Sequence, residues 1–171
     1  MCDCLFGALG VMAGSQATMN NFIWGNDKIQ NYETICGGTG AGPNFHGTSA
    51  VQTHMTNTRS TDPEILEARF PVRLEEYSIR KNSGGKGMFN GGDGVTRKLR
   101  FLEPMTVTTL CSHRKVQPFG LNGGEPGQCG KEWLEKKDGK FIRLEGNDSC
   151  EVKVNDLFVM ETPGGGGYGS K

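Results

Sequence analysis

The amino-acid sequence predicts a mainly β protein of the α+β class, with glycine-rich mixed or antiparallel sheets and two short helices. Three observations lead to this prediction. Glycine supplies 27 of the 171 residues, against an average near 7%, and it lacks the period of three that collagen requires. Short runs of β-branched and aromatic residues recur between the glycine clusters. Only two segments show helical spacing of apolar residues.

The first predicted helix lies in the apolar stretch 5–14. Leu5, Leu9 and Met12 are separated by four and three residues, so they share one face. Gly14 is expected to end this helix. No nearby segment offers an obvious mate for the apolar face, so we expect it to be exposed or covered by another copy of the chain. Because exposed apolar surface favours association, the sequence predicts a homo-oligomer.

The second predicted helix begins after Asp62. This residue occupies the N-cap position and Pro63 the first helical position, and acidic residues follow in the first turns. Ile65, Leu66 and Phe70 would form the apolar face. The segment is therefore predicted to be a short amphipathic helix.

The strands are predicted from alternation, β-branched content and turn residues. The predicted strands are Phe22–Trp24, Asn31–Cys36, Val72–Lys81, Val95–Leu102, Met105–Leu110, Trp133–Glu135, Lys140–Leu144 and Val152–Val159. The dipeptide 138–139 is Asp-Gly and predicts a hairpin. The last strand is interrupted at Asn155 and Asp156.

Two glycine-rich segments are predicted to be irregular. The stretch Gly37–Ala50 has no apolar period and is interpreted as a close-packed turn region whose glycines adopt positive φ. It could cradle a phosphate, but it lacks both the P-loop lysine and the helix that a dinucleotide fingerprint requires. The tail Pro163–Gly169 fits a flexible end. It also fits a tightly packed backbone, because Tyr168 within the glycine run can mark docking.

Charge and cysteine content limit the classes of function. With 19 basic and 19 acidic residues, there is no global electrostatic case for nucleic acid or for an anionic membrane. No export signal and no apolar stretch of about 20 residues is visible. We therefore expect a cytoplasmic protein of one domain, residues 1–171, whose six cysteines are free thiols.

The sequence alone assigns no catalytic residue, no cofactor site and no metal site. His46, His54 and His113 follow no ligand spacing, and each fits a hydrogen-bonded loop histidine. Cys2 and Cys4 form CxC rather than the CxxC of a zinc site. A GxSxG nucleophile motif is also missing from the sequence.

The segment Thr53–Pro71 holds the candidate functional residues. Asp62 has a structural explanation as a helix cap, whereas His54, Asn57 and Arg59 lie in a polar run with little apolar content to bury. We expect these four residues to line a cleft or to form a surface between domains or chains.

Four ordered segments carry a resemblance to a known family. They are Met19–Asn26, Thr39–Leu102, Pro118–Gly127 and Thr162–Gly169. Together they resemble the hydantoinase B/5-oxoprolinase family over nearly the whole chain. Within it, the chain most resembles the carboxy-terminal part of the B half of the ATP-dependent 5-oxoprolinases. Its first methionine corresponds to the middle of a helix in the family, so we expect a fragment or a truncated product.

The resemblance implies a cyclic amide hydrolase that converts 5-oxo-L-proline and ATP into L-glutamate, ADP and phosphate. The family enzyme would use ATP and Mg²⁺, and this chain alone would bind neither. Its partners would be a hydantoinase A-type domain or subunit and the missing part of the B half, so the chain is expected to be inactive alone. A non-catalytic scaffold domain that docks on an A-type subunit is the alternative. The choice among lactam, hydantoin and ketone substrates stays open.

Overall fold

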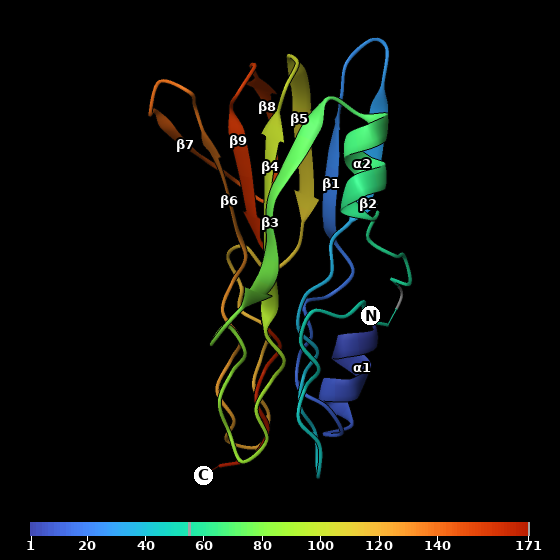
Figure 1. Ribbon diagram of the computed structural model, residues 1–171. Helices are drawn as coiled ribbons and strands as arrows, with labels where there is room; N and C mark the ends of the chain where they lie inside the picture. Colours follow the sequence, from blue (N-terminus) through green and yellow to red (C-terminus); the bar gives the residue numbers. More distant parts are fainter. Residues whose placement is uncertain (55, 171) are drawn as a thin grey trace.

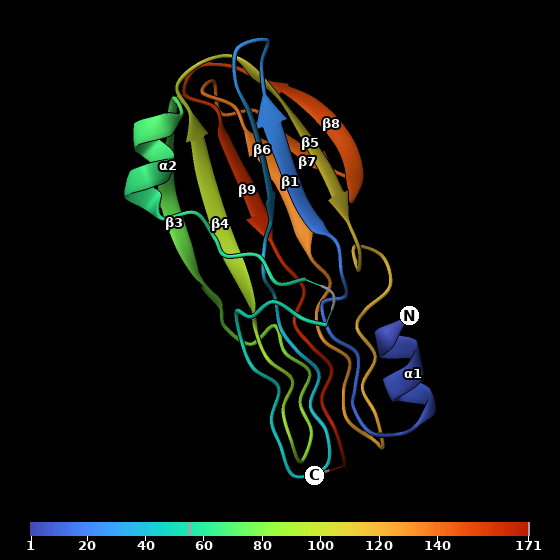
Figure 2. The same cartoon turned by 90° about the vertical axis from the view of Figure 1, so that its right-hand side faces the viewer.

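The computed structural model describes residues 1–54 and 56–170, and it contains two facing antiparallel sheets (Figures 1 and 2). The smaller sheet has the strand order β2, β1, β5, β8, and the larger has β3, β4, β9, β6, β7. The strands are β1 (Asn20–Gly25), β2 (Gln30–Thr34), β3 (Val72–Arg80), β4 (Gly94–Phe101), β5 (Met105–Cys111), β6 (Lys131–Glu135), β7 (Phe141–Leu144), β8 (Asn147–Val152) and β9 (Leu157–Glu161). The helices are α1 (Cys2–Ala8) and α2 (Pro63–Arg69). The predicted mainly β fold with two short helices is confirmed.

Aromatic side chains hold the two sheets together. Phe22 of β1 stacks on Phe158 of β9, with ring centroids 4.9 Å apart and an interplanar angle of 14°. Trp24 meets Phe101 of the other sheet edge-on at 5.9 Å and Phe70 at 5.1 Å. These inward-facing residues form one core between the sheets, as in a β-sandwich.

Helix α2 covers one side of this core. Its Leu66 is fully buried, and Phe70 packs against the same cluster. Asp62 caps the helix, because its Oδ1 accepts a hydrogen bond from the backbone N–H of Glu64 at 3.0 Å. The predicted cap and the predicted apolar positions 66 and 70 are confirmed, whereas Ile65 is 48% exposed.

Two predicted elements differ from the observed ones. The predicted strand Val152–Val159 is wrong, because the turn at 153–156 carries the chain from β8 in one sheet to β9 in the other. Asn155 adopts φ 71° in this turn.

Helix α1 ends at Ala8, so Met12 lies beyond it, and Gly10 rather than Gly14 takes the positive φ after its end. The exposed apolar face is confirmed for Leu5 and Leu9, which are 56% and 72% exposed.

Below the sheets in both views, extended glycine-rich segments run side by side (Figures 1 and 2). At their centre lies the run Gly164–Gly167. The backbone N–H groups of Gly165, Gly166 and Gly167 donate in turn to the carbonyls of residues 92, 14 and 125, at 2.8, 2.8 and 2.9 Å. Successive N–H groups of the run thus point to three different neighbouring segments, as they do in an extended helix with three residues per turn. The tail is therefore a packed central segment, and the flexible-end interpretation is wrong.

Close packing, rather than positive φ, explains most of these glycines. A Cβ atom on Gly165 would lie 1.8 Å from the carbonyl oxygen of Thr39, and one on Gly38 would lie 1.9 Å from that of Gly92. The predicted positive φ of the glycines between 37 and 47 is wrong, because none of them adopts it. The space between neighbouring backbones leaves room only for hydrogen.

The N-cap predicts the effect of a single substitution. Asp62→Ala should lower the free energy of unfolding by about 1 kcal/mol, because it removes the acceptor for an N–H at the start of α2. Chemical denaturation measures this change, and Asp62→Asn is the matched control because it keeps an acceptor oxygen. Unchanged stability of Asp62→Ala, together with lost activity in a reconstituted enzyme, would instead make Asp62 a site residue.

Candidate functional site

The polar segment singled out in the sequence forms a strap, residues 52–54 and 56–61, between the end of the loop 37–51 and α2. Thr53 is buried, and its Oγ1 donates to the carbonyl of Ala17 at 3.0 Å. The backbone N–H of Thr53 donates to Thr56 Oγ1 at 3.0 Å, while the N–H and hydroxyl of Thr56 both donate back to the Thr53 carbonyl. The threonine run therefore closes a local turn with its own side chains.

His54 fastens α1 to this strap. Its Nε2 lies 2.8 Å from Asp3 Oδ1, and its ring lies 5.1 Å from the ring of Phe6. The second oxygen of Asp3 accepts a hydrogen bond from Ser15 Oγ at 3.0 Å. The His54 side chain is only 14% exposed. These contacts give His54 a structural position between α1 and the strap.

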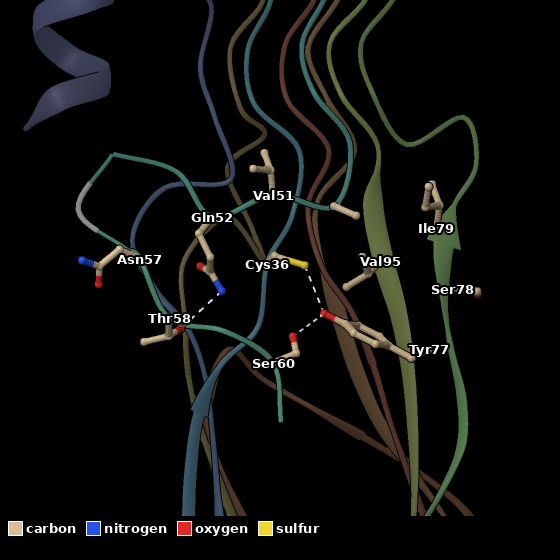
Figure 3. A pocket seen from close by; sticks show the side chains of 11 residues that line it. Cys36, Val51, Gln52, Asn57, Thr58, Ser60, Tyr77, Ser78, Ile79 and Val95 are labelled. Atoms are coloured by element: carbon tan, nitrogen blue, oxygen red, sulfur yellow. Dashed lines mark hydrogen bonds between the residues drawn. The ribbon is translucent and has the colours of Figure 1, made fainter. Parts of the chain in front are cut away.

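A groove of about 490 Å³ lies between the strap and β3 (Figure 3). At its floor the side chains of Cys36, Tyr77 and Ser60 converge. Cys36 Sγ lies 3.1 Å from the Tyr77 hydroxyl, which lies 2.9 Å from Ser60 Oγ. The lining residues are Cys36, Ala50, Val51, Gln52, Asn57, Thr58, Ser60, Tyr77, Ser78, Ile79 and Val95. No charged side chain of the described residues is among them.

A buried ion pair lies behind this floor. Arg97 of β4 donates from Nη2 to Glu33 Oε2 of β2 at 2.7 Å, and the two side chains are 1% and 7% exposed. The Arg97 guanidinium carbon lies 5.4 Å from the centre of the Tyr77 ring. Within the described residues, Arg97 Nε and Nη1 have no hydrogen-bond partner. The groove thus has a positively charged group directly beneath its aromatic floor.

The thiol and the phenol of this groove are protonated at neutral pH, and burial raises the pKa of both further. Burial raises the pKa of Cys36, and the hydrogen bond from Tyr77 only partly offsets that effect. Burial likewise raises the pKa of Tyr77 to about 12. Since a thiolate rather than a thiol is the nucleophile, Cys36 is unsuited to nucleophilic catalysis in this setting. The groove is better suited to donating hydrogen bonds.

A family model described as hydantoinase B/oxoprolinase matches residues 1–171. The chain belongs to the hydantoinase B/oxoprolinase family. It is 49% identical over 169 residues to a 5-oxoprolinase of Dictyostelium discoideum, and 48% identical over 168 residues to 5-oxoprolinase 1 of Arabidopsis thaliana. These alignments cover 99% and 98% of this chain but 13% of each relative.

A solved structure shares the fold of this chain. The crystal structure of an ATP-dependent caprolactamase from Pseudomonas jessenii superposes with a TM-score of 0.76 at 24% identity. The superposition covers 94% of this chain and 30% of the caprolactamase chain. The resemblance to the hydantoinase B/5-oxoprolinase family, read from four sequence segments, is confirmed, and the chain spans about an eighth of its curated relatives.

The structure gives the four predicted site residues of this family member different surroundings. Asn57 lines the groove beside β3 and also a second groove of about 320 Å³ on the other side of the strap. Arg59 is exposed and lines neither groove. His54 contacts α1, and Asp62 caps α2. A shared cleft or interface role for the four residues stays a prediction.

Sequence reasoning missed the residues at the groove floor. Cys36 and Tyr77 were assigned to separate strands, and they meet across 41 positions of the chain. Ser60 lies within the segment Thr53–Pro71, and the sequence predicts no partner for it. Because long-range pairing brings these three together, no local spacing signals the contact.

The three histidines have separate hydrogen-bond partners, as predicted for loop histidines. His46 Nδ1 accepts from the backbone N–H of Asn90 at 2.9 Å, and His113 Nδ1 lies 2.7 Å from the Val116 carbonyl oxygen. Over residues 1–54 and 56–170, no cluster of three or more His, Cys, Asp or Glu side chains could hold a metal ion. The six cysteines are free, which confirms that prediction. No helix in this part of the chain is long and apolar enough to span a membrane.

The raised pKa of Tyr77 can be tested by titration. Of the three tyrosines, Tyr77 should ionise at about pH 12, above the ordinary value of 10.0. Its contribution to stability is therefore fully present below pH 10 and is lost as the pH rises toward 12. Phenolate absorbance after rapid pH jumps measures this step, which Tyr77→Phe should remove. Tyr32→Phe, at an exposed position, is the control and should leave the late step intact. Removal of an early step near pH 10 by Tyr77→Phe would contradict the assignment.

Proposed function

We propose that this chain is a module of an ATP-dependent cyclic amide hydrolase of the 5-oxoprolinase type. The whole enzyme would convert 5-oxo-L-proline, ATP and water into L-glutamate, ADP and phosphate. The observation that carries this proposal is the 49% identity to a 5-oxoprolinase over 99% of the chain. The chain would act with a hydantoinase A-type domain or subunit and with the remaining part of the B half.

The groove beside β3 does not fit a bound ATP–Mg²⁺ complex. Among the described residues, no lysine or arginine lines this groove to meet a triphosphate. The described part of the chain also lacks a cluster of carboxylates and histidines for a metal ion. We therefore place the ATP and Mg²⁺ sites of the proposed enzyme in its other parts.

Ring opening also needs a reactive group, and the buried thiols of the described residues are poorly suited to that role. An unstrained amide is a poor electrophile, so its hydrolysis requires activation or a strong nucleophile. Burial raises the pKa of Cys36, of Cys111 to about 12 and of Cys150 to about 11. These thiols stay protonated near neutral pH and are weak nucleophiles. This supports a module that is inactive alone.

A non-catalytic interaction domain is the second candidate function. It is favoured by the exposed apolar residues Leu5 of α1 and Leu9 just after it, which a docked A-type partner or another copy of the chain would cover. Copurification with an A-type polypeptide that yields no hydrolysis would support this candidate over the enzyme module.

Glutamate release from 5-oxo-L-proline with ATP and Mg²⁺ tests the proposal. The chain should be inactive alone. A mixture with a separately made polypeptide that carries the A half and the rest of the B half should be active. The complementary polypeptide alone is the control. It should release glutamate at no more than about a tenth of the mixture's rate, because a site that lacks one of its parts positions the substrate poorly.

Two results would contradict the proposed module. Glutamate formation by the chain alone would require an ATP site within these 171 residues. Full activity of the complementary polypeptide alone would make the chain unnecessary for catalysis, and the interaction-domain candidate would then account for it.

A further inference from the structure

The groove between the strap and β3 offers a spare hydrogen-bond donor. Cys36, Tyr77 and Ser60 carry three thiol or hydroxyl hydrogens, and two contacts, of 3.1 and 2.9 Å, join them into a chain. Each contact uses one hydrogen, so one of the three hydrogens is left free to donate. Within the described residues, neither Ser60 Oγ nor Cys36 Sγ makes a further side-chain hydrogen bond. A ligand with a strong acceptor would complete the chain.

A positive charge lies directly behind these donors. Arg97 is 1% exposed, and only its Nη2 pairs with Glu33. Two further nitrogens of its guanidinium lack partners among the described residues, although buried donors without partners are costly. Burial raises the pKa of Cys36 and of Tyr77, whereas the charge of Arg97 acts on both in the opposite direction. The Arg97 charge is therefore felt at the floor of the groove.

The rest of the groove is neutral, and part of it is apolar. Val51, Ile79 and Val95 add apolar side chains to the lining (Figure 3). The volume of about 490 Å³ is that of a small-molecule site. Within the part of the chain that the structure describes, no acidic residue lines the groove and would repel an anion. The groove thus combines donors, a positive charge behind them and a surface for carbon atoms.

We propose that this groove binds a small carboxylic acid. Its carboxylate would accept one hydrogen bond, from the spare hydrogen of the chain Ser60, Tyr77 and Cys36, with Arg97 as the nearby positive charge. Its carbon skeleton would pack against Val51 and Ile79. A carboxylate is a stronger acceptor than a neutral carbonyl, so the groove distinguishes acids from neutral amides of the same shape.

The inference goes beyond the proposed function and rests on it only for the choice of test ligands. The substrate and the product of the proposed reaction both carry a carboxylate, whereas an unsubstituted lactam does not. If the groove selects acids, it favours acidic cyclic amides over neutral lactams and ketones as ligands of this family member.

Isothermal titration calorimetry on the 171-residue chain tests the proposal. The two test ligands are 5-oxo-L-proline and 2-pyrrolidinone, which share the lactam ring and differ only in the carboxylate. The acid should bind about tenfold more tightly, because a hydrogen bond to a charged acceptor is stronger than one to a neutral acceptor.

Three variants locate the binding in the groove. Ser60→Ala and Tyr77→Phe should each weaken binding of the acid by about tenfold, because each interrupts the chain of donors. Ser78→Ala is the matched control: Ser78 lines the same groove, but its hydroxyl donates to Glu76 Oε1 at 2.5 Å. This variant should bind the acid as the unaltered chain does. Circular dichroism checks that each variant is folded.

The proposal is overturned if both ligands bind equally, if neither binds, or if Ser60→Ala and Tyr77→Phe leave the acid's affinity unchanged. The glutamate assay judges the proposed function separately. Glutamate release by the mixture, without acid binding in the groove, would reject the groove proposal alone. Selective acid binding, without any glutamate release, would reject the proposed reaction and leave the carboxylate site in place.

Discussion

The run Gly164–Gly167 occupies the centre of the glycine-rich bundle, and its backbone is hydrogen-bonded on all sides. Successive N–H groups donate to segments around residues 92, 14 and 125, and the carbonyls of Gly165 and Gly166 accept from Gly85 and Ala41. Backbone groups this deeply buried must be paired, because an unpaired one is costly. Each pairing needs close backbone approach, so a side chain at the centre would separate segments far apart in the sequence.

This packing also positions the candidate site. Gly38 donates to the carbonyl of Pro163, and Gly37 exchanges backbone hydrogen bonds with Val51. The loop 37–51 is thereby held against the central run, with Cys36 at its start and the strap at its end. The groove forms where this fixed loop meets Tyr77 on the edge strand β3. The geometry of the donors therefore depends on glycines that never touch a ligand.

Local chemistry made much of the fold predictable from the sequence. The Asp62 cap and the hairpin through Gly139 follow from residue type at fixed positions, and both are observed. The exchange of sheets at Asn155 was missed because alternation reports which face is buried, not which sheet a strand joins. The sequence left the tail open between a flexible end and a packed backbone, because a glycine run looks the same whether solvent or backbone surrounds it. The groove floor arises from long-range pairing, which no local pattern contains.

The stability of the Gly165→Ala variant tests the central role of the glycine run most directly. The added methyl group would lie 1.8 Å from the Thr39 carbonyl oxygen, and backbone atoms cannot give way cheaply. The account predicts a loss of at least about 3 kcal/mol in the free energy of unfolding, or failure to fold. Gly139→Asn, at a position with φ 85° and open space, is the control and should cost less than about 1 kcal/mol. A Gly165→Ala protein as stable as this control would contradict the account.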